Sequence, residues 1–155
     1  MMNPTRRHVL KTAASAGLVG TAIAAGLLKP GLVLADWNSA GFAATKAADA
    51  LAAIGAAGAA ESKDIQVKAP DIAENGAVVP VEIVTTLPNV ESIALLGEKN
   101  ANPLIAQYTL TDFDGSLSTR MKLGQTANVR VVVKAGGKFY TAAKEVKVTV
   151  GGCGG

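Results

Sequence analysis

The feature that most constrains the fold of this 155-residue chain is a two-residue period of apolar side chains that begins at Ile65. A period of two places successive side chains on opposite faces of an extended strand, so each such segment has one face suited to a core. Alternating segments or short apolar runs of strand type lie at 79–84, 93–96, 104–110, 129–133 and 145–150. The sequence from Ile65 onward therefore predicts strands.

Turn-forming residues separate these segments at Asn75-Gly76, Pro88-Asn89, Asp114-Gly115 and Gly136-Gly137. Glycine, asparagine, aspartate and proline each favour tight turns. Six or seven short strands with turns at this spacing are typical of a β-sandwich. We predict a mainly β fold, an immunoglobulin-like antiparallel β-sandwich over residues 63–150.

Pro80 lies inside one of the predicted strands. Because proline has no N–H to donate to a neighbouring strand, it is usually found on edge strands or at bulges. We therefore predict that the strand holding Pro80 lies at an edge of its sheet or carries a bulge, and that this edge is a candidate partner surface.

Residues 37–54 follow a helical pattern instead. Apolar side chains recur at alternating spacings of three and four, at Trp37, Ala40, Ala44, Ala47, Leu51 and Ile54. Asn38 or Ser39 is suited to cap the start of a helix. We predict one packing helix and a small-residue linker at 55–62, which together make up residues 36–62.

Residues 1–35 have the composition of an export signal. Arg6-Arg7 precedes a weakly apolar stretch at 13–28, as in twin-arginine signal peptides. That stretch is shorter than the roughly 20 apolar residues that a spanning helix needs. Val33-Leu34-Ala35 fits a small-x-small cleavage site, which starts the mature chain at Asp36. We predict a periplasmic protein exported by the twin-arginine route; the alternatives are an uncleaved anchor or an ordinary secretory signal.

Cleavage after Ala35 changes the charge of the chain. The removed segment contains Arg6, Arg7, Lys11 and Lys29 and no acid, which leaves 11 of the 15 basic residues against 12 acidic ones. The net charge falls from +3 to −1, which argues against nucleic acid as a partner.

The removed segment also holds His8, the single histidine of the chain. The mature sequence therefore has no imidazole for a general base, a Cys–His pair or a Ser–His–Asp triad. One cysteine cannot form a thiolate cluster around a metal. We expect no catalytic residues, no cofactor, no metal site, and a protein that is not an enzyme by itself.

The chain ends in Gly151-Gly152-Cys153-Gly154-Gly155, which contains its single cysteine. Glycine adopts backbone angles closed to other residues, so we expect a flexible arm that leaves the thiol exposed. Cys153 follows Val150 by three residues, a reach of roughly 10 Å beyond the last predicted strand. An odd cysteine in an exported protein indicates a reactive thiol or an intermolecular disulfide. The pattern predicts a thiol that enters the active sites of other proteins.

The chain resembles SoxY, the sulfur-carrier subunit of the periplasmic Sox thiosulfate-oxidation system. Its twin-arginine start and its C-terminal GGCGG are part of the resemblance, and the GGCGG is the most specific element. The other matching segments are APDIAENG (69–76) leading into VPV (79–81), EKN (98–100), TRMK (119–122) and KEVKVTV (144–150).

The resemblance implies a carrier that forms a heterodimer with a SoxZ-like subunit. The cysteine matching Cys153 holds the sulfur substrate covalently, and Gly151, Gly152, Gly154 and Gly155 form the arm. A haem-containing SoxAX-like enzyme joins thiosulfate to the thiol, and a manganese-containing SoxB-like hydrolase releases sulfate. Where present, a SoxCD-like dehydrogenase oxidises the sulfur that remains. These enzymes are expected to dock transiently.

Four cations, Lys99, Arg120, Lys122 and Lys147, are candidates for orienting anionic partners or adducts, although a solvated charge is the commoner role of such residues.

Three other interpretations remain open. A ubiquitin-like sulfur carrier would use a thiocarboxylate on Gly155, but that chemistry needs ATP and leaves Cys153 unexplained. A non-catalytic interaction module would use Cys153 only for a disulfide-linked dimer. An enzyme with a cysteine nucleophile is disfavoured because the mature sequence lacks histidine.

Overall fold

The structure, a computed structural model, describes residues 38–149. The predicted signal segment, Trp37 and the C-terminal arm lie outside the described residues. The described chain contains two short helices, α2 (Ser39–Ala43) and α3 (Ala47–Ala53), followed by strands. The strands are β1 (Ala60–Glu61), β2 (Ile65–Lys68), β3 (Ile72–Ala73), β4 (Val79–Thr85), β5 (Val90–Gly97), β6 (Leu104–Thr109), β7 (Ser116–Met121), β8 (Ala127–Ala135) and β9 (Lys138–Val148).

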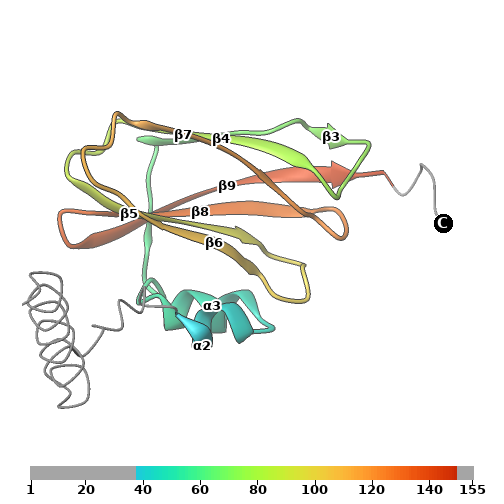
Figure 1. Cartoon of the computed structure of the whole chain (residues 1–155), viewed down its shortest axis with the longest axis horizontal. Coiled ribbons are helices and arrows are strands. Elements are labelled where there is room, and N and C mark those ends of the chain that lie inside the picture. Colours follow the sequence, from blue (N-terminus) through green and yellow to red (C-terminus); the bar gives the residue numbers. More distant parts are fainter. Residues whose placement is uncertain (1–37, 150–155) are drawn as a thin grey trace, which may run out of the picture. The chain divides into compact units, whose positions relative to one another are not determined.

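The strands form two layers. The larger sheet has the order β1-β9-β8-β5-β6, with β3 also paired to β9, and the smaller sheet has the order β2-β4-β7. Figure 1 shows the smaller sheet on one side of the larger one and the two helices on the other side. The predicted β-sandwich is confirmed.

The core between the sheets follows from the two-residue period. In β4, Val79, Val81 and Ile83 are 2% exposed or less, whereas Pro80 between them faces solvent. The same alternation buries one face of each long strand of the larger sheet, including Ile93, Leu95, Val129, Val131, Val133 and Val146. Burying each of these side chains stabilises the fold by about 1.5–3 kcal/mol.

The pairing is not antiparallel throughout. The short strands β1 and β3 both run parallel to β9, with Ala60 opposite Tyr140 and Ile72 opposite Lys147. The segment at 55–62, predicted as a linker, therefore contributes a strand to the larger sheet. Two-residue strands carry too little alternation to reveal this pairing in the sequence.

The predicted single helix is two helices. Asn38 caps α2 as expected, because its side chain accepts a hydrogen bond from the Gly41 N–H at 2.9 Å. The helix then ends at Ala44, whose backbone is extended, and α3 begins at Ala47. The buried position in α2 also differs from the prediction, because Gly41 is buried and Ala40 is exposed.

The helices cover a second, smaller core on the outer face of the larger sheet. Ala50 of α3 and Ala56 after it are buried there against four side chains of the sheet, Ala94, Leu96, Leu104 and Val132. The small side chains let the helices lie close to the strands, since an added Cβ on Gly41 would approach the Leu104 side chain to 2.9 Å. The prediction of a packing helix holds for both pieces.

The prediction for Pro80 is wrong for the strand as a whole, because β4 is the central strand of the smaller sheet. The register explains how this position accepts a proline. Pro80 is opposite Arg120 of β7, but the pairing of β4 with β2 ends at Glu82 opposite Lys68. The strand at Pro80 therefore has a neighbour on one side only, and no ladder bond is lost.

Gly76 offers a direct test of this packing, because it supports the end of β9. A Cβ at this position would lie 2.4 Å from the Leu123 carbonyl oxygen and 2.8 Å from a Val148 methyl. We expect Gly76→Ala to lower the free energy of unfolding by about 1–3 kcal/mol, the usual cost of overpacking, in urea titrations of the mature chain.

Gly58→Ala is the matched control, since nothing lies within 4 Å of its added Cβ. It should leave the stability within about 0.5 kcal/mol of the parent or raise it slightly. Equal stability losses in the two variants would contradict the close approach at Gly76.

Candidate functional site

The predicted arm follows β9, so the end of this strand is the candidate functional site. β9 is paired with β8 from Lys138 to Val146; on its other side it is paired with β1 at residues 140–141 and with β3 at residues 147–148. Val146, three residues from the end of the described chain, is completely buried. The strand that precedes the arm is thus held by neighbours on both sides and by the core.

Backbone hydrogen bonds continue to the last described residue. The Lys147 N–H donates to the Asp71 carbonyl at 3.0 Å, and the Thr149 N–H donates to the Ala73 carbonyl at 3.2 Å. Between them, the Val148 N–H donates to the Thr126 hydroxyl at 3.0 Å. The main chain is therefore held by hydrogen bonds up to Thr149, two residues before the predicted arm.

An ion pair adds to this attachment. Lys144 Nζ lies 2.9 Å from Asp71 Oδ1 and donates to the Ala69 carbonyl at 2.6 Å. The hydrogen bond and the charge of Lys144, with a smaller contribution from Lys147, hold the pKa of Asp71 below its ordinary value. The segment before β3 is thereby joined to β9 through a side chain as well as through the backbone.

Two loops pack around the same end of the sandwich: residues 98–103, between β5 and β6, and residues 122–126, between β7 and β8. The Asn100 side chain joins them, since it donates to the Lys122 carbonyl at 2.7 Å and accepts from the Gly124 N–H at 3.0 Å. Leu123 in turn donates its N–H to the Gly76 carbonyl at 2.7 Å. The segments 69–76, 98–100 and 119–122, which carry the sequence resemblance, are thus linked to one another near the end of β9.

The loop of residues 98–103 is also attached to the larger sheet through Glu98. Glu98 pairs with Arg130 Nε at 2.5 Å and accepts a hydrogen bond from Asn128 at 2.9 Å. Both charged side chains are about three-quarters buried, which strengthens the pair relative to an exposed one. No pattern in the sequence indicated a role for Asn100 or Glu98, apart from their place in the EKN segment that matches the SoxY family.

The four candidate cations lie at exposed positions. Within residues 38–149, the side chains of Lys99, Arg120 and Lys122 have no ion pair or hydrogen bond, and Lys147 interacts electrostatically with Asp71. Their predicted role toward anionic partners stays a prediction.

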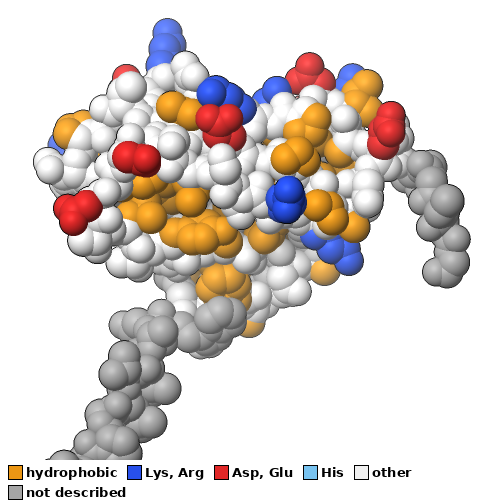
Figure 2. Space-filling view, turned by 45° about the horizontal axis from the view of Figure 1, so that its top comes forward, with side chains coloured by type: hydrophobic (Ala, Val, Ile, Leu, Met, Phe, Trp, Pro, Cys, Tyr) orange, Lys and Arg blue, Asp and Glu red, His pale blue; other side chains and the backbone are white. Residues whose placement is uncertain are grey.

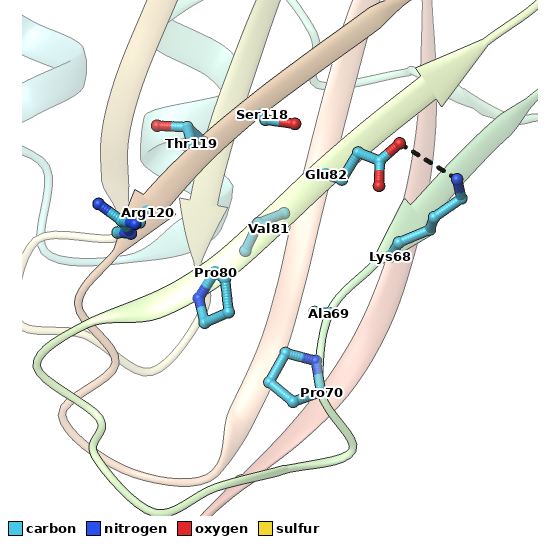
Figure 3. Close-up of a pocket in the computed structure, with 9 residues that line it drawn as sticks. All are labelled: Lys68, Ala69, Pro70, Pro80, Val81, Glu82, Ser118, Thr119 and Arg120. Carbon is cyan, nitrogen blue, oxygen red and sulfur yellow. Dashed lines mark hydrogen bonds and ion pairs between the residues drawn. The ribbon is translucent and has the colours of Figure 1, made fainter.

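An open groove of about 820 Å³ lies on the outer face of the smaller sheet, at the part of β4 that β2 leaves unpaired. Figure 3 shows the nine residues that line it: Lys68, Ala69, Pro70, Pro80, Val81, Glu82, Ser118, Thr119 and Arg120. Lys68 and Glu82 are paired across it at 3.1 Å. The predicted partner surface at Pro80 therefore includes this groove beside the unpaired part of β4, and its role toward a partner stays a prediction.

Neither a metal centre nor a membrane span is found in the part of the chain that the structure describes. Residues 38–149 contain no group of three or more histidine, cysteine, aspartate or glutamate side chains placed to hold a metal ion. Helices α2 and α3 are too short to cross a bilayer.

The fold and the sequence that follows it define a small β-sandwich protein with a cysteine-bearing C-terminal extension. The family model described as sulfur oxidation protein SoxY matches residues 50–153, which include Cys153. The chain belongs to the SoxY family.

Solved structures agree with this assignment. The sulfur carrier protein SoxY from Chlorobium limicola f thiosulfatophilum is 43% identical, with a TM-score of 0.61; the match covers 69% of this chain and 95% of that one. A superoxide reductase (neelaredoxin) from Ignicoccus hospitalis is 16% identical with a TM-score of 0.50, covering 58% and 83% of the two chains, which shows a shared fold alone. Among curated proteins, no sequence matches the chain.

The predicted site residues Gly151, Gly152, Cys153, Gly154 and Gly155 lie outside the described residues. The structure therefore places the surface from which the arm starts, and the role of the thiol stays a prediction from the sequence.

The pairing of Lys144 with Asp71 leads to a pH prediction. We expect Lys144→Met to raise the pKa of the Asp71 carboxyl toward its ordinary value, measured by NMR titration. Because the folded-state pKa is the lower one, this pair stabilises the fold above the unfolded pKa, and that contribution is lost as the pH falls through the folded pKa.

Glu91 serves as the internal control, since its pKa is lowered by Lys134 and the Gly137 N–H and should not change in Lys144→Met. An unchanged pKa of Asp71 in the variant would contradict the contact.

Proposed function

We propose that this protein is the sulfur carrier of a periplasmic thiosulfate-oxidation system and holds sulfur intermediates covalently on Cys153. One observation carries the proposal: a family match that extends to Cys153, the single cysteine, which stands five residues beyond the end of β9. The 43% identity to a protein described as a sulfur carrier supports the same role.

The loading step is an oxidation. The Cys153 thiol and one thiosulfate form a sulfur–sulfur bond, giving a cysteine S-thiosulfonate with loss of one proton and two electrons. The electrons pass to a haem-containing SoxAX-like enzyme. The thiolate is the reacting form of the cysteine, and the mature sequence has no histidine to generate it, so the enzyme activates the thiol.

The release step is a hydrolysis. Water attacks the terminal sulfone group, the bond between that group and the sulfane sulfur attached to Cys153 breaks, and sulfate and two protons are released. A persulfide then remains on Cys153 for a SoxCD-like dehydrogenase. In both steps the carrier supplies the attachment atom and the reach, and the enzyme supplies the catalytic groups, so the carrier is not an enzyme.

The composition of the arm supports a carrier that presents the thiol while the enzymes supply the catalytic groups. Two glycines on each side of Cys153 give the backbone access to angles that other residues avoid, and they add no side-chain bulk. A cysteine on such an arm fits a narrow channel better than one on a strand or helix. We propose that the arm, residues 151–155, delivers the adduct into each enzyme in turn.

Localisation and assembly complete the proposal. Residues 1–35 direct export by the twin-arginine route, and the mature chain forms a heterodimer with a SoxZ-like subunit. A disulfide between two Cys153 thiols would join two copies and block loading, because the carrier atom would then be occupied.

The test is the intact mass of the mature protein, purified with its partner subunit and incubated with thiosulfate and a SoxAX-like enzyme. We expect an adduct of thiosulfate mass that a reductant removes, because the new bond is a sulfur–sulfur bond. Cys153→Ser should gain no mass.

A bare thiol after the incubation, or a disulfide-linked dimer as the sole product, would contradict the carrier and leave an interaction module. An adduct that persists in Cys153→Ser would place the chemistry elsewhere, for example at the Gly155 carboxylate.

A further inference from the structure

Two large apolar side chains are exposed in the described part of the chain: Ile72 in β3, which pairs with the end of β9, and Val78 in the segment between β3 and β4. Ile72 is 58% exposed and lies opposite Lys147 in the sheet. Val78 is 52% exposed and follows Gly76, whose added Cβ would touch Val148. Burying them on a partner would be favourable by roughly 25 cal/mol per Å² of apolar area.

This apolar patch continues into the groove. Pro70 precedes Ile72 by two residues, Pro80 follows Val78 by two residues, and both prolines line the groove together with Arg120. We call Pro70, Ile72, Val78, Pro80 and Arg120 the arm-side surface. Figure 2 shows hydrophobic side chains gathered on the face that includes this part of the molecule, with charged side chains among them.

From this arrangement we infer that the arm-side surface is the docking surface for the enzyme that loads the thiol; the inference rests on the proposed function. The chain length limits where the enzyme can sit. Cys153 is four residues beyond Thr149, so its Cα stays within about 14 Å of that residue. An enzyme that takes the thiol into its active site must cover the surface around Thr149, and Thr149 is hydrogen-bonded to Ala73, next to Ile72.

The charge of this surface specifies the partner's chemistry. Lys68 in the groove is neutralised by Glu82, whereas Arg120 has no ion pair or hydrogen bond among the described residues. Arg120 therefore offers a guanidinium that can bind a carboxylate with two hydrogen bonds. We expect the enzyme to present an acidic residue and an apolar contact beside the entrance to its active site.

The experiment compares loading kinetics of charge-reversed carriers. Arg120→Glu is the test variant, and Lys138→Glu is the matched control, because Lys138 is exposed and lies at the opposite end of β9. Ten residues separate it from Val148, about 33 Å along a strand. Each mature carrier, with its partner subunit, is titrated against a SoxAX-like enzyme with excess thiosulfate and a one-electron acceptor that reoxidises the haem, and the adduct on Cys153 is followed by intact mass.

We expect Arg120→Glu to raise the KM for the carrier about tenfold and leave kcat unchanged, since the residue acts in docking and not on the reacting atoms. Lys138→Glu should stay within about twofold of the parent. The double variant Ile72→Ser/Val78→Ser should raise KM in the same direction, and both exposed sites should tolerate the change without loss of stability.

Two results would overturn the inference. A KM unchanged in both test variants would remove the surface from docking. Loss of the heterodimer in either variant, seen by gel filtration, would assign the surface to the partner subunit instead. Failure of the parent carrier itself to gain an adduct is a different result, because it contradicts the proposed function and removes the inference with it.

Discussion

The attachment of β9 on both sides is the constraint on which the site depends. β8 pairs with it from Lys138 to Val146, and the two short parallel strands pair with its other edge, the second of them at its last two residues. The Lys144–Asp71 ion pair and the hydrogen bond from Thr149 to Ala73 reinforce the same edge. The main chain is therefore held in place up to Thr149, and the proposed partners of Cys153 must meet the domain within reach of that residue.

The physical demands on a carrier explain the contrast between the domain and its C-terminal sequence. In the proposed function several active sites receive the same thiol, so the attachment atom needs reach, while recognition needs a surface of constant shape. The sandwich meets the second demand with a core of valine, isoleucine and leucine side chains that are almost completely buried. The glycines around Cys153 favour the reach of the thiol, because glycine adopts backbone angles that other residues avoid.

The sequence predicted the sandwich because valine and isoleucine alternate over segments long enough to define a buried face. It could not predict the break between α2 and α3, since the three-and-four spacing of apolar residues runs through Ala44, and the sheet beneath decides which side chains are buried. The edge-strand prediction from Pro80 was wrong for a related reason. A proline has no N–H for a ladder hydrogen bond at its own position, but it does not reveal that the pairing with β2 ends two residues away. At the site, the frame of glycines pointed to Cys153, whose role stays a prediction. The sequence could not show that Ile72 lies opposite Lys147 or that Pro80 lies opposite Arg120, because these neighbours follow from the strand pairing.

The most direct measurement follows each sulfur atom of thiosulfate separately. Thiosulfate carrying a sulfur isotope at either its inner or its outer position is supplied to the mature carrier with SoxAX-like and SoxB-like enzymes. The account predicts that the outer, sulfane label remains on Cys153 in a form that a reductant releases, while the inner, sulfone label leaves as sulfate. Release of both labels together, or retention of either label by Cys153→Ser, would contradict covalent carriage on this thiol.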